Sequence, residues 1–283
     1  MKISYWPEYT ALNSKEPYSA ALESLQNFGH TLAKESYDAD AAIIWSVLWH
    51  GRMTPNKTVW NHYRNQNKPV IVIEVGGIKR GTTWKVGLNG INRTACFGSA
   101  GNDSSRAIKL GLFCKPWIQG GDFILICGQH DKSLQWQGMP PMSKWVMNTI
   151  DQLQIHYDYP IVFRPHPRCK LPDIERQYKN VYRQDPKPIA DTYDDFDMNF
   201  NNVKYTVSWS SNPGIHSIIG GVPAHVGPHS LAFDVACPHL LMVDNPHMPN
   251  RQQWLNDYAW TEYTIEEIAN GLPWTKLGDA LNG

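Results

Sequence analysis

Short apolar runs alternate with longer amphipathic segments along the chain, and they predict strands and helices in turn. In the first part of the chain, apolar runs predict strands near Lys2–Tyr5, Ala41–Trp45 and Val70–Glu74. Apolar residues at helical spacing predict helices over Tyr18–Asn27 and Val59–Asn65. Such alternation is typical of α/β layers with a mainly parallel sheet.

The alternation is interrupted by Lys115–Asp122, whose proline and glycines are typical of a linker. The pattern then restarts, with strands predicted at Phe123–Cys127, Ile161–Phe163, Tyr205–Ser208 and Pro223–Val226, and helices at Lys144–Leu153, from Pro213, at Arg251–Tyr258 and at Ile265–Asn270. We therefore predict two α/β domains, 1–118 and 119–283, with the last helices free to pack back on the first domain. A cleft between two such domains is a common place for a small-molecule site.

Two polar clusters follow predicted strands in the second domain. One is Ser208–Ser217, in which small hydroxyl and amide residues precede a Pro-Gly pair. This pattern predicts a strand-to-helix turn whose free backbone N–H groups point at an anion. The other is Arg164–Arg168, with the sequence Arg-Pro-His-Pro-Arg. Both clusters come at carboxyl ends of strands, which predicts a phosphate-bearing ligand, interpreted here as the diphosphate of a nucleotide sugar.

The two clusters supply most of the predicted donor-binding residues. These are Arg164, His166, Arg168, Ser208, Ser210, Ser211, Asn212, Pro213, Gly214, His216 and Ser217. Arginine suits a bidentate phosphate contact, and two prolines stiffen the loop that presents it. The alternative for the serine-rich turn is a simple helix cap, and for the arginine cluster a surface turn. His216 is equally well explained as an ordinary helix residue.

The net charge of zero conceals an uneven distribution. Between residues 45 and 115 the chain has eleven Lys and Arg but only Glu74 and Asp103 as acids, a net charge of +9. Trp49, Trp60, His62, Tyr63 and Trp84 are interleaved with these cations. Basic residues among aromatics are what a nucleic-acid surface requires, because the charges meet phosphates and the rings stack on unpaired bases. The alternative is a solvated face around an ordinary aromatic core.

Transfer of a sugar from such a donor needs a base that deprotonates the acceptor hydroxyl, and the first part of the chain offers three candidates. Glu74 ends an apolar strand before two glycines, and it ranks first as the base, ahead of Asp103 and His50. Glu74 could instead pair with Lys79 or Arg80, and Asp103 could cap a helix. The predicted acceptor-binding residues are Arg52, Trp60, Lys79, Arg80, Trp84, Lys85, Asn89 and Arg93.

The cysteine content and the lengths of the apolar runs indicate in which compartment the protein is expected. The five cysteines are scattered and odd in number, which predicts reduced thiols and no zinc site. No apolar run approaches the roughly 20 residues that cross a bilayer, and the N-terminus lacks a secretory pattern. We therefore expect a cytoplasmic protein without a transmembrane segment.

Several of these motifs together resemble the donor-binding domain of GT-B glycosyltransferases. The residues concerned are Ile124–Gln129, Arg164–Pro167, Ser210–Gly214, Gly221–Ala224 and Arg251–Leu255, with Glu74–Arg80 and Val86–Gly90 in the first half. The chain is most similar to the capsule-polysaccharide-synthesis type and its bacteriophage relatives. It differs at His216, where many relatives carry a glutamate. The resemblance adds Gly128, Gln129 and His130 to the expected donor contacts.

The resemblance implies the GT-B fold, with two Rossmann-like domains, the donor held by the second and the acceptor by the first, which should also supply the base. It implies an enzyme that needs no metal or other cofactor, with a UDP-sugar, UDP-glucose by default, as donor. The basic acceptor side favours double-stranded DNA as partner, with glycosylation of 5-hydroxymethylcytosine in phage DNA. The first alternative is transfer to a surface or capsular polysaccharide. The second is a nucleotide-sugar-binding protein without catalytic activity. The sequence leaves the oligomeric state and the stereochemical outcome open.

Overall fold

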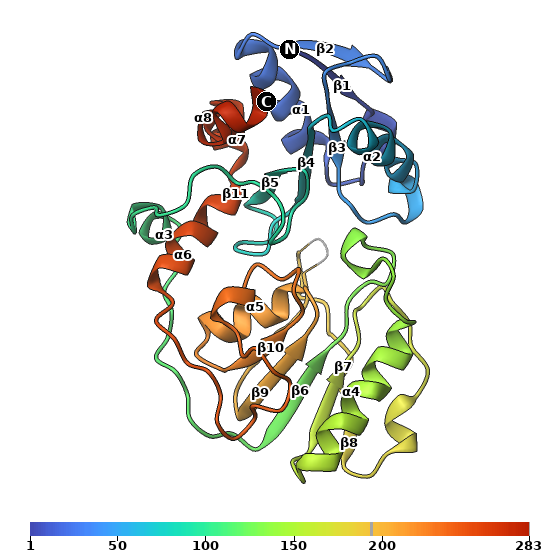
Figure 1. Cartoon of the computed structure of the whole chain (residues 1–283), viewed down its shortest axis with the longest axis vertical. Coiled ribbons are helices and arrows are strands. Elements are labelled where there is room, and N and C mark those ends of the chain that lie inside the picture. The colour runs from blue at the N-terminus through green and yellow to red at the C-terminus, as the bar shows by residue number, and fades with distance from the viewer. Residues whose placement is uncertain (193–194, 283) are drawn as a thin grey trace. The chain divides into compact units, whose positions relative to one another are not determined.

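The computed structural model describes residues 1–192 and 195–282 (Figure 1). The chain divides into two compact units, the first made of 1–110 and 256–283 and the second of 111–255. The division falls ahead of the predicted linker, and the C-terminal segment belongs to the first unit.

Within the described residues, the first unit contains a six-stranded sheet in the order β11-β5-β4-β3-β1-β2. Its strands are β1 (Lys2–Tyr5), β2 (Thr31–Lys34), β3 (Ala41–Trp45), β4 (Val70–Val75), β5 (Trp84–Leu88) and β11 (Glu262–Tyr263). Strands β1 to β4 are parallel, whereas β5 is antiparallel to both of its neighbours, β4 and β11. The last strand of the chain thus completes the sheet that the first strand begins.

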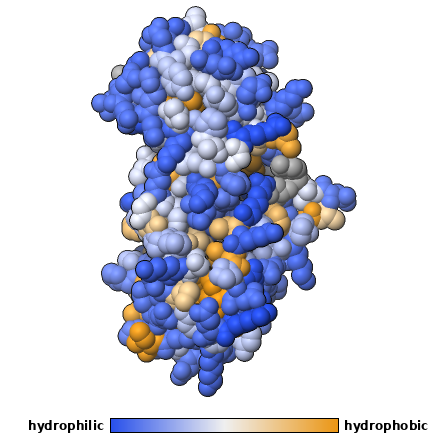
Figure 2. Space-filling model, turned by 90° about the vertical axis from the view of Figure 1, so that its right-hand side faces the viewer, coloured by the Kyte–Doolittle hydropathy of each residue, from blue (hydrophilic) through white to orange (hydrophobic). Residues whose placement is uncertain are grey.

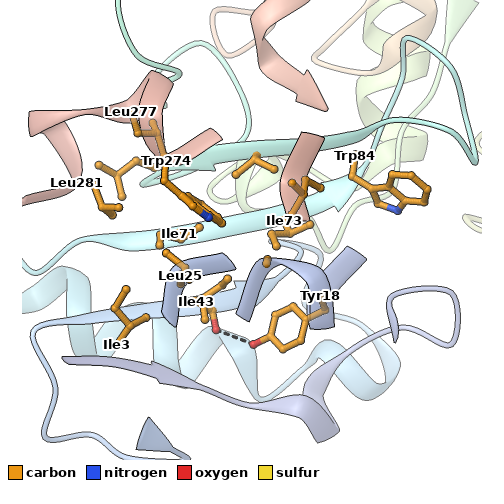
Figure 3. Packing of buried hydrophobic residues seen from close by; sticks show 14 of the residues in the cluster. Ile3, Tyr18, Leu25, Ile43, Ile71, Ile73, Trp84, Trp274, Leu277 and Leu281 are labelled. Carbon is orange, nitrogen blue, oxygen red and sulfur yellow. Dashed lines mark hydrogen bonds between the residues drawn. The ribbon is translucent and has the colours of Figure 1, made fainter. Parts of the chain in front are cut away.

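Helices α1 (Lys15–Asn27), α2 (Asn56–Asn65) and α3 (Ser105–Lys109) belong to the first unit, as do α7 (Ile265–Ala269), α8 (Leu272–Leu277) and α9 (Asp279–Asn282). Figure 3 shows the core that they form with the sheet: Ile3, Ile43, Ile71 and Ile73 from the strands, Leu25 and Tyr18 from α1, and Trp274, Leu277 and Leu281 from the C-terminal helices. The Trp274 indole donates to Ser24 Oγ at 2.8 Å. The C-terminal helices are therefore part of this core.

In the second unit, five strands among the described residues form an all-parallel sheet in the order β10-β9-β6-β7-β8. They are β6 (Phe123–Cys127), β7 (Ile161–Arg164), β8 (Val181–Arg183), β9 (Val203–Ser208) and β10 (Ala224–Val226). Helices α4 (Met142–His156) and α5 (Asn212–Ile219) connect strands, and α6 (Gln252–Tyr258) leads toward β11. The strand order reverses between β6 and β9, and ligands of open α/β sheets bind at such a switch point.

The prediction of α/β layers with mainly parallel sheets is confirmed, and the expected strands and helices are present with ends shifted by a few residues. Four strands were not predicted. Strands β2, β8 and β11 contain only 4, 3 and 2 residues. In β5, Lys85 and Gly87 interrupt the apolar pattern, although all of its residues are buried.

The face drawn in Figure 2 is covered largely by hydrophilic residues, with apolar residues in small groups. In the part of the chain that the structure describes, no helix has the length and apolar character needed to span a bilayer.

The charge asymmetry read from residues 45–115 does not carry over to the folded unit. Counted over 1–110 and 256–283, the first unit has fourteen Lys and Arg and thirteen Asp and Glu, a net charge of +1. The N-terminal segment and the returning C-terminal segment supply the additional carboxylates. The prediction of a strongly basic domain is therefore wrong for the unit as a whole.

Candidate functional site

The predicted donor-binding segments meet at the carboxyl edge of the second sheet. Cys127 at the end of β6 is in register with Arg164 at the end of β7 and with Ser208 at the end of β9. The loops that follow these strands therefore start side by side. The Gly128 N–H donates to the Arg164 carbonyl at 2.9 Å, which ties the first two loops together.

Gln129 joins the loop after β6 to the turn after β9. Its side-chain oxygen accepts from the N–H and the hydroxyl of Ser210, at 2.9 and 3.0 Å. Its amide nitrogen donates to Ser133 Oγ at 3.3 Å. Gln129 is buried, so these bonds fix the shape of the edge at the switch point. They also mean that the Ser210 N–H already has a partner within the protein.

Helix α5 begins at this edge, packed tightly on β9. A Cβ at Gly214 would lie 2.3 Å from Ser208 Oγ and 2.9 Å from Val226 Cγ1, so only glycine fits there. Pro213, in the first turn, has the backbone angle that a helix start requires. Ser211 precedes the helix but makes no side-chain cap, and its buried hydroxyl has no hydrogen-bond partner within residues 1–192 and 195–282. The simple-cap alternative thus does not describe Ser211.

Two histidines lie together at the same edge. The rings of His130 and His166 are 5.6 Å apart and nearly perpendicular. The Nδ1 of His130 is 3.2 Å from the Lys132 N–H, and that of His166 is 3.1 Å from the Arg168 N–H. Because each Nδ1 accepts a hydrogen bond, each neutral ring carries its proton on Nε2, where it can donate to an anion.

Arg164 has a different role from the predicted one. Its guanidinium is buried and pairs with Asp197, with Nη2 to Oδ1 at 2.9 Å and a second bond to the Asp197 carbonyl. The N–H of Lys187 and then Arg164 lower the pKa of Asp197. Arg164 therefore holds Asp197, whose carboxylate also accepts from the Lys187 N–H, while Arg168 is exposed.

Ser217 and His216, two predicted donor-binding residues on α5, differ in burial. Ser217 is fully buried, and its hydroxyl is bonded to Thr206 Oγ1 at 2.8 Å and to the Val222 carbonyl at 3.0 Å. Ser217 thus stabilises the packing of α5 on β9, and its prediction as a donor ligand is corrected. His216 is half-buried one turn into the helix, where either reading of the sequence would place it.

Glu74 lies at the carboxyl end of β4, beside the end of β3. Ser46, which follows β3, has a left-handed backbone with φ of 66° and donates its hydroxyl to Glu74 Oε2. The Val75 N–H donates to Oε1 at 2.9 Å. Burial raises the pKa of Glu74, and the bonds from Ser46 and Val75 with the charges of Arg80 and Lys85 offset this only in part.

The other two candidate bases are exposed. Asp103 accepts from the backbone N–H and the hydroxyl of Ser105, the first residue of α3. These bonds lower the pKa of Asp103, as expected for the helix-start alternative. His50 precedes a short turn at Gly51–Met53.

The predicted acceptor residues differ in how far they are exposed. Arg52, Lys79 and Arg93 are exposed, Trp60 and Arg80 are half-buried, and Trp84 and Lys85 are buried in β5. Asn89 accepts from Arg64 Nη1 and from the Val70 N–H, both at 2.9 Å, and shapes the turn after β5. The side chains of Trp84, Lys85 and Asn89 thus contribute to the fold, and their assignment as acceptor-binding residues stays a prediction.

A buried carboxylate that sequence reasoning missed lies beneath the loop after Glu74. Glu262 of β11 is fully buried and accepts from the N–H groups of Gly77 and Ile78, at 2.7 and 2.9 Å, and from Thr83 Oγ1 at 2.7 Å. Its Oε1 is 3.9 Å from Lys85 Nζ. The residues that make these bonds are 179 to 185 positions apart in the chain, so no local pattern could have indicated them.

Arg106 binds residues 259–267, the part of the C-terminal segment that returns to the first unit. It donates to the carbonyls of Ala259 and Glu262 and to both carboxylate oxygens of Glu267. Its guanidinium also lies 4.7 Å from the ring centres of Trp260 and Tyr263. Arg106 was counted with the basic stretch, but it is buried within this cluster.

A cavity of about 300 Å³ opens next to this region of the first unit. It is lined by Lys79, Thr82, Thr83, Lys109, Leu110, Thr264, Glu266, Glu267 and Asn270. Lys109 is paired with Glu267 at 2.8 Å across it. Among the described residues there is no cluster of three His, Cys, Asp or Glu side chains that could hold a metal ion, and the five cysteines are free thiols.

No protein-family model and no curated protein sequence matches the chain. Its fold is similar to that of a solved structure described as Thermosulfurimonas dismutans KpsC, beta Kdo 2,4 transferase, with a TM-score of 0.52, 13% identity, and coverage of 96% of this chain and 98% of that one. A second structure, the beta Kdo 2,7 transferase of the same organism's KpsC, aligns with a TM-score of 0.45 and 12% identity over 98% of this chain and 100% of that one. At 13% identity, the first similarity shows a shared fold.

Proposed function

We propose that this protein is a glycosyltransferase that takes a sugar from a nucleotide diphosphate donor. The observation that carries the proposal is the meeting of three polar loops at the switch point of the second sheet, where α5 begins. A helix start carries a partial positive charge and N–H groups that suit a diphosphate. The fold shared with a Kdo transferase supports the same reaction class.

The donor would lie across the 208–214 turn. The first turn of α5 and the Nε2–H groups of His130 and His166 are the donors proposed for the diphosphate. Gln129 positions the turn through Ser210, and Arg164 positions the neighbouring loop through Asp197. Donors fixed in this way stabilise charge that develops on the leaving group, and the proposal includes no metal ion.

Glu74 is the proposed base. As the acceptor oxygen forms its bond to the anomeric carbon, its proton passes to Glu74, and the bond from that carbon to the diphosphate oxygen breaks. The nucleoside diphosphate leaves with the bonding electrons. A raised pKa makes Glu74 a better proton acceptor than an ordinary glutamate, provided that the pH is high enough to ionise it.

The first proposed acceptor is 5-hydroxymethylcytosine in double-stranded DNA. Exposed cations Arg52 and Lys57 lie near the start of α2, and the rings of Trp49 and Trp60 pack 6.3 Å apart in the same region. Cations could contact phosphates, and a base must leave the duplex to reach an enclosed sugar. Because the unit as a whole has a net charge of only +1, the proposed DNA contact is confined to the cations near the start of α2.

A glycan acceptor is the second candidate. The observation that favours it is the fold shared with a protein described as a Kdo transferase. Both candidate reactions use the same donor site and the same base. They differ only in the acceptor whose hydroxyl Glu74 would deprotonate.

The test is a transfer assay with EDTA present. The full-length protein is incubated with UDP-glucose, UDP-galactose or UDP-N-acetylglucosamine, together with 5-hydroxymethylcytosine DNA or an oligosaccharide. Mass spectrometry of the nucleosides and oligosaccharides then detects an added sugar. A glycosylated nucleoside supports the DNA acceptor, and an extended oligosaccharide supports the glycan. Absence of transfer and of donor hydrolysis in every combination would contradict the proposal.

A further inference from the structure

Three charged side chains lie opposite one another across adjacent strands of the first sheet. In the antiparallel registers, Lys85 of β5 is directly opposite Glu74 of β4 on one side and Glu262 of β11 on the other. Directly opposed residues of antiparallel strands project from the same face. We call Glu74, Lys85 and Glu262 the carboxylate–lysine row.

The lysine of this row is paired with only one of its two carboxylates. Its Nζ is 3.9 Å from Glu262 Oε1, and both side chains are buried. Within the described residues, no ion pair joins Lys85 to Glu74, which instead accepts from the Ser46 hydroxyl and the Val75 N–H. Lys85 is therefore paired with Glu262 and not with Glu74, the proposed base.

Glu262 is held rigidly in this position. The N–H groups of Gly77 and Ile78 and the hydroxyl of Thr83 all donate to its carboxylate, at 2.7 to 2.9 Å. A Cβ at Gly76 would lie 2.4 Å from Glu262 Oε2, so the loop can approach the carboxylate only with glycine there. Glu262 thus fixes the loop that directly follows β4.

We propose that Glu262 is a positioning residue that draws Lys85 away from Glu74 and thereby keeps Glu74 available as a proton acceptor. The proposal rests on the proposed function, in which Glu74 is the base. It explains why a carboxylate from the last strand of the chain is buried beside the loop of the candidate base. A neutral residue at position 262 would leave Glu74 as the nearest carboxylate for the Lys85 charge.

The groups around Glu74 determine how its ionisation would respond to a neutral residue at position 262. The groups that act on it are the Ser46 hydroxyl from the end of β3, the Val75 N–H, Arg80 in the following loop and Lys85 on β5. Burial lowers the pKa of Lys85, Glu262 and Glu74 raise it, and Arg80 lowers it. If Glu262 loses its charge, Lys85 is expected to turn toward Glu74 and to favour its ionised form.

The test is the titration of Glu74 in the full-length protein, followed by NMR of ¹³C-carboxyl-labelled glutamate. A Glu74→Gln variant assigns the resonance, and no donor or acceptor is added. In Glu262→Gln, the Glu74 midpoint is expected to move to lower pH. In Glu266→Gln, which removes an exposed carboxylate nearby, the midpoint should stay at the wild-type value. An unchanged midpoint in a folded Glu262→Gln protein overturns the proposal.

A second variant keeps the test decisive if Glu262→Gln does not fold. Glu262→Gln combined with Lys85→Met replaces the buried ion pair with neutral side chains, an exchange that proteins often tolerate. Here the Glu74 midpoint should lie at or above the wild-type value, because the lysine is gone. A midpoint below it contradicts the proposal.

Activity then separates this inference from the proposed function. If transfer occurs, Glu262→Gln should move the acid limb of the pH–rate profile to lower pH and reduce kcat at neutral pH roughly threefold to tenfold, because a less basic carboxylate is a weaker base. If the NMR midpoint of Glu74 shifts but no sugar is transferred, the effect of Glu262 on Glu74 is supported, and only the glycosyltransferase proposal is contradicted.

Discussion

Glu74 has two properties that a proton acceptor needs, a fixed orientation and a raised pKa. Ser46 and the Val75 N–H orient its carboxylate, and burial raises its pKa. Asp103 is a carboxylate from the same basic stretch with the opposite surroundings, since it is exposed and its pKa is lowered by Ser105. The pair therefore provides a candidate and a matched control.

We expect Glu74→Gln to lower kcat for sugar transfer by about 10²- to 10⁴-fold, the usual contribution of a general base. The donor KM should change little, because the donor site is assigned to the other unit. Steady-state kinetics on both substrates measures this. Asp103→Asn should stay within about twofold of wild type, and an equal loss in both variants would remove Glu74 from the mechanism.

Glu267 makes a residue-level prediction about stability. Burial would raise its pKa, but the hydrogen bonds from Arg106, Lys109 and Thr264 outweigh burial and lower the pKa to about 2. A carboxyl whose folded pKa is depressed stabilises the protein above its unfolded pKa, and this contribution is lost as the pH falls toward 2. The free energy of unfolding should therefore decrease between about pH 5 and pH 2, by on the order of 3 kcal/mol from this group.

Urea unfolding across this pH range measures the decrease, and Glu267→Gln should flatten it while lowering stability at pH 7. Glu266→Gln is the neighbouring control, because Glu266 is exposed. A Glu267→Gln protein with the wild-type pH dependence would show that the Arg106 cluster does not stabilise the fold in this way.

At the scale of elements, the start of α5 depends on the absence of a side chain at Gly214. We expect Gly214→Ala to push the helix off β9, because its Cβ would lie 2.3 Å from Ser208 Oγ. Donor affinity should fall at least tenfold in a calorimetric titration with UDP-glucose. Adding Ser208→Ala removes that oxygen and should restore part of the affinity, although Val226 Cγ1 remains at 2.9 Å. No loss in Gly214→Ala would contradict the role given to this turn.

The elements of the second sheet were the most predictable part of the fold. Strands β6 and β7 begin as continuous apolar runs, β9 has apolar residues at alternate positions, and polar residues follow all three; parallel strands bring those ends to one edge. The meeting of Gln129 with Ser210 follows from this geometry. The partners of Arg164 and Ser217 could not be predicted, because the sequence identifies a polar residue without showing which neighbour satisfies it.

The first sheet was less predictable for a different reason. Its strand β11 has 2 residues, and they pair with residues of β5 that are 177 and 179 positions away in the sequence. The roles of Lys85 and Arg106 depend on Glu262 and Glu267 from that returning segment. A local reading of residues 45–115 therefore counted both cations as surface charge.

At the scale of the whole molecule, the two units should differ in whether they fold alone. The fragment 111–255 contains a complete sheet and its own core, including Ile124, Phe163 and Tyr205. We expect it to unfold cooperatively and to bind UDP-glucose. The fragment 1–110 should not fold, because it buries Lys85 and Arg106 without Glu262 and Glu267.

Circular dichroism and calorimetry on the two fragments make the comparison, with a mixture of 1–110 and a 256–283 peptide as the control. Recovery of folded structure in the mixture would support the role of the returning segment. A cooperatively folded 1–110 fragment, or a folded 111–255 fragment that binds no nucleotide sugar, would contradict the assignment.

The most direct measurement is a crystal structure of the full-length protein with an intact UDP-sugar. We predict that the diphosphate lies at the carboxyl edge of the second sheet, within hydrogen-bond distance of the first turn of α5 and near His130 and His166. A diphosphate bound elsewhere on the protein, or crystals that take up no donor at millimolar concentration, would contradict the account.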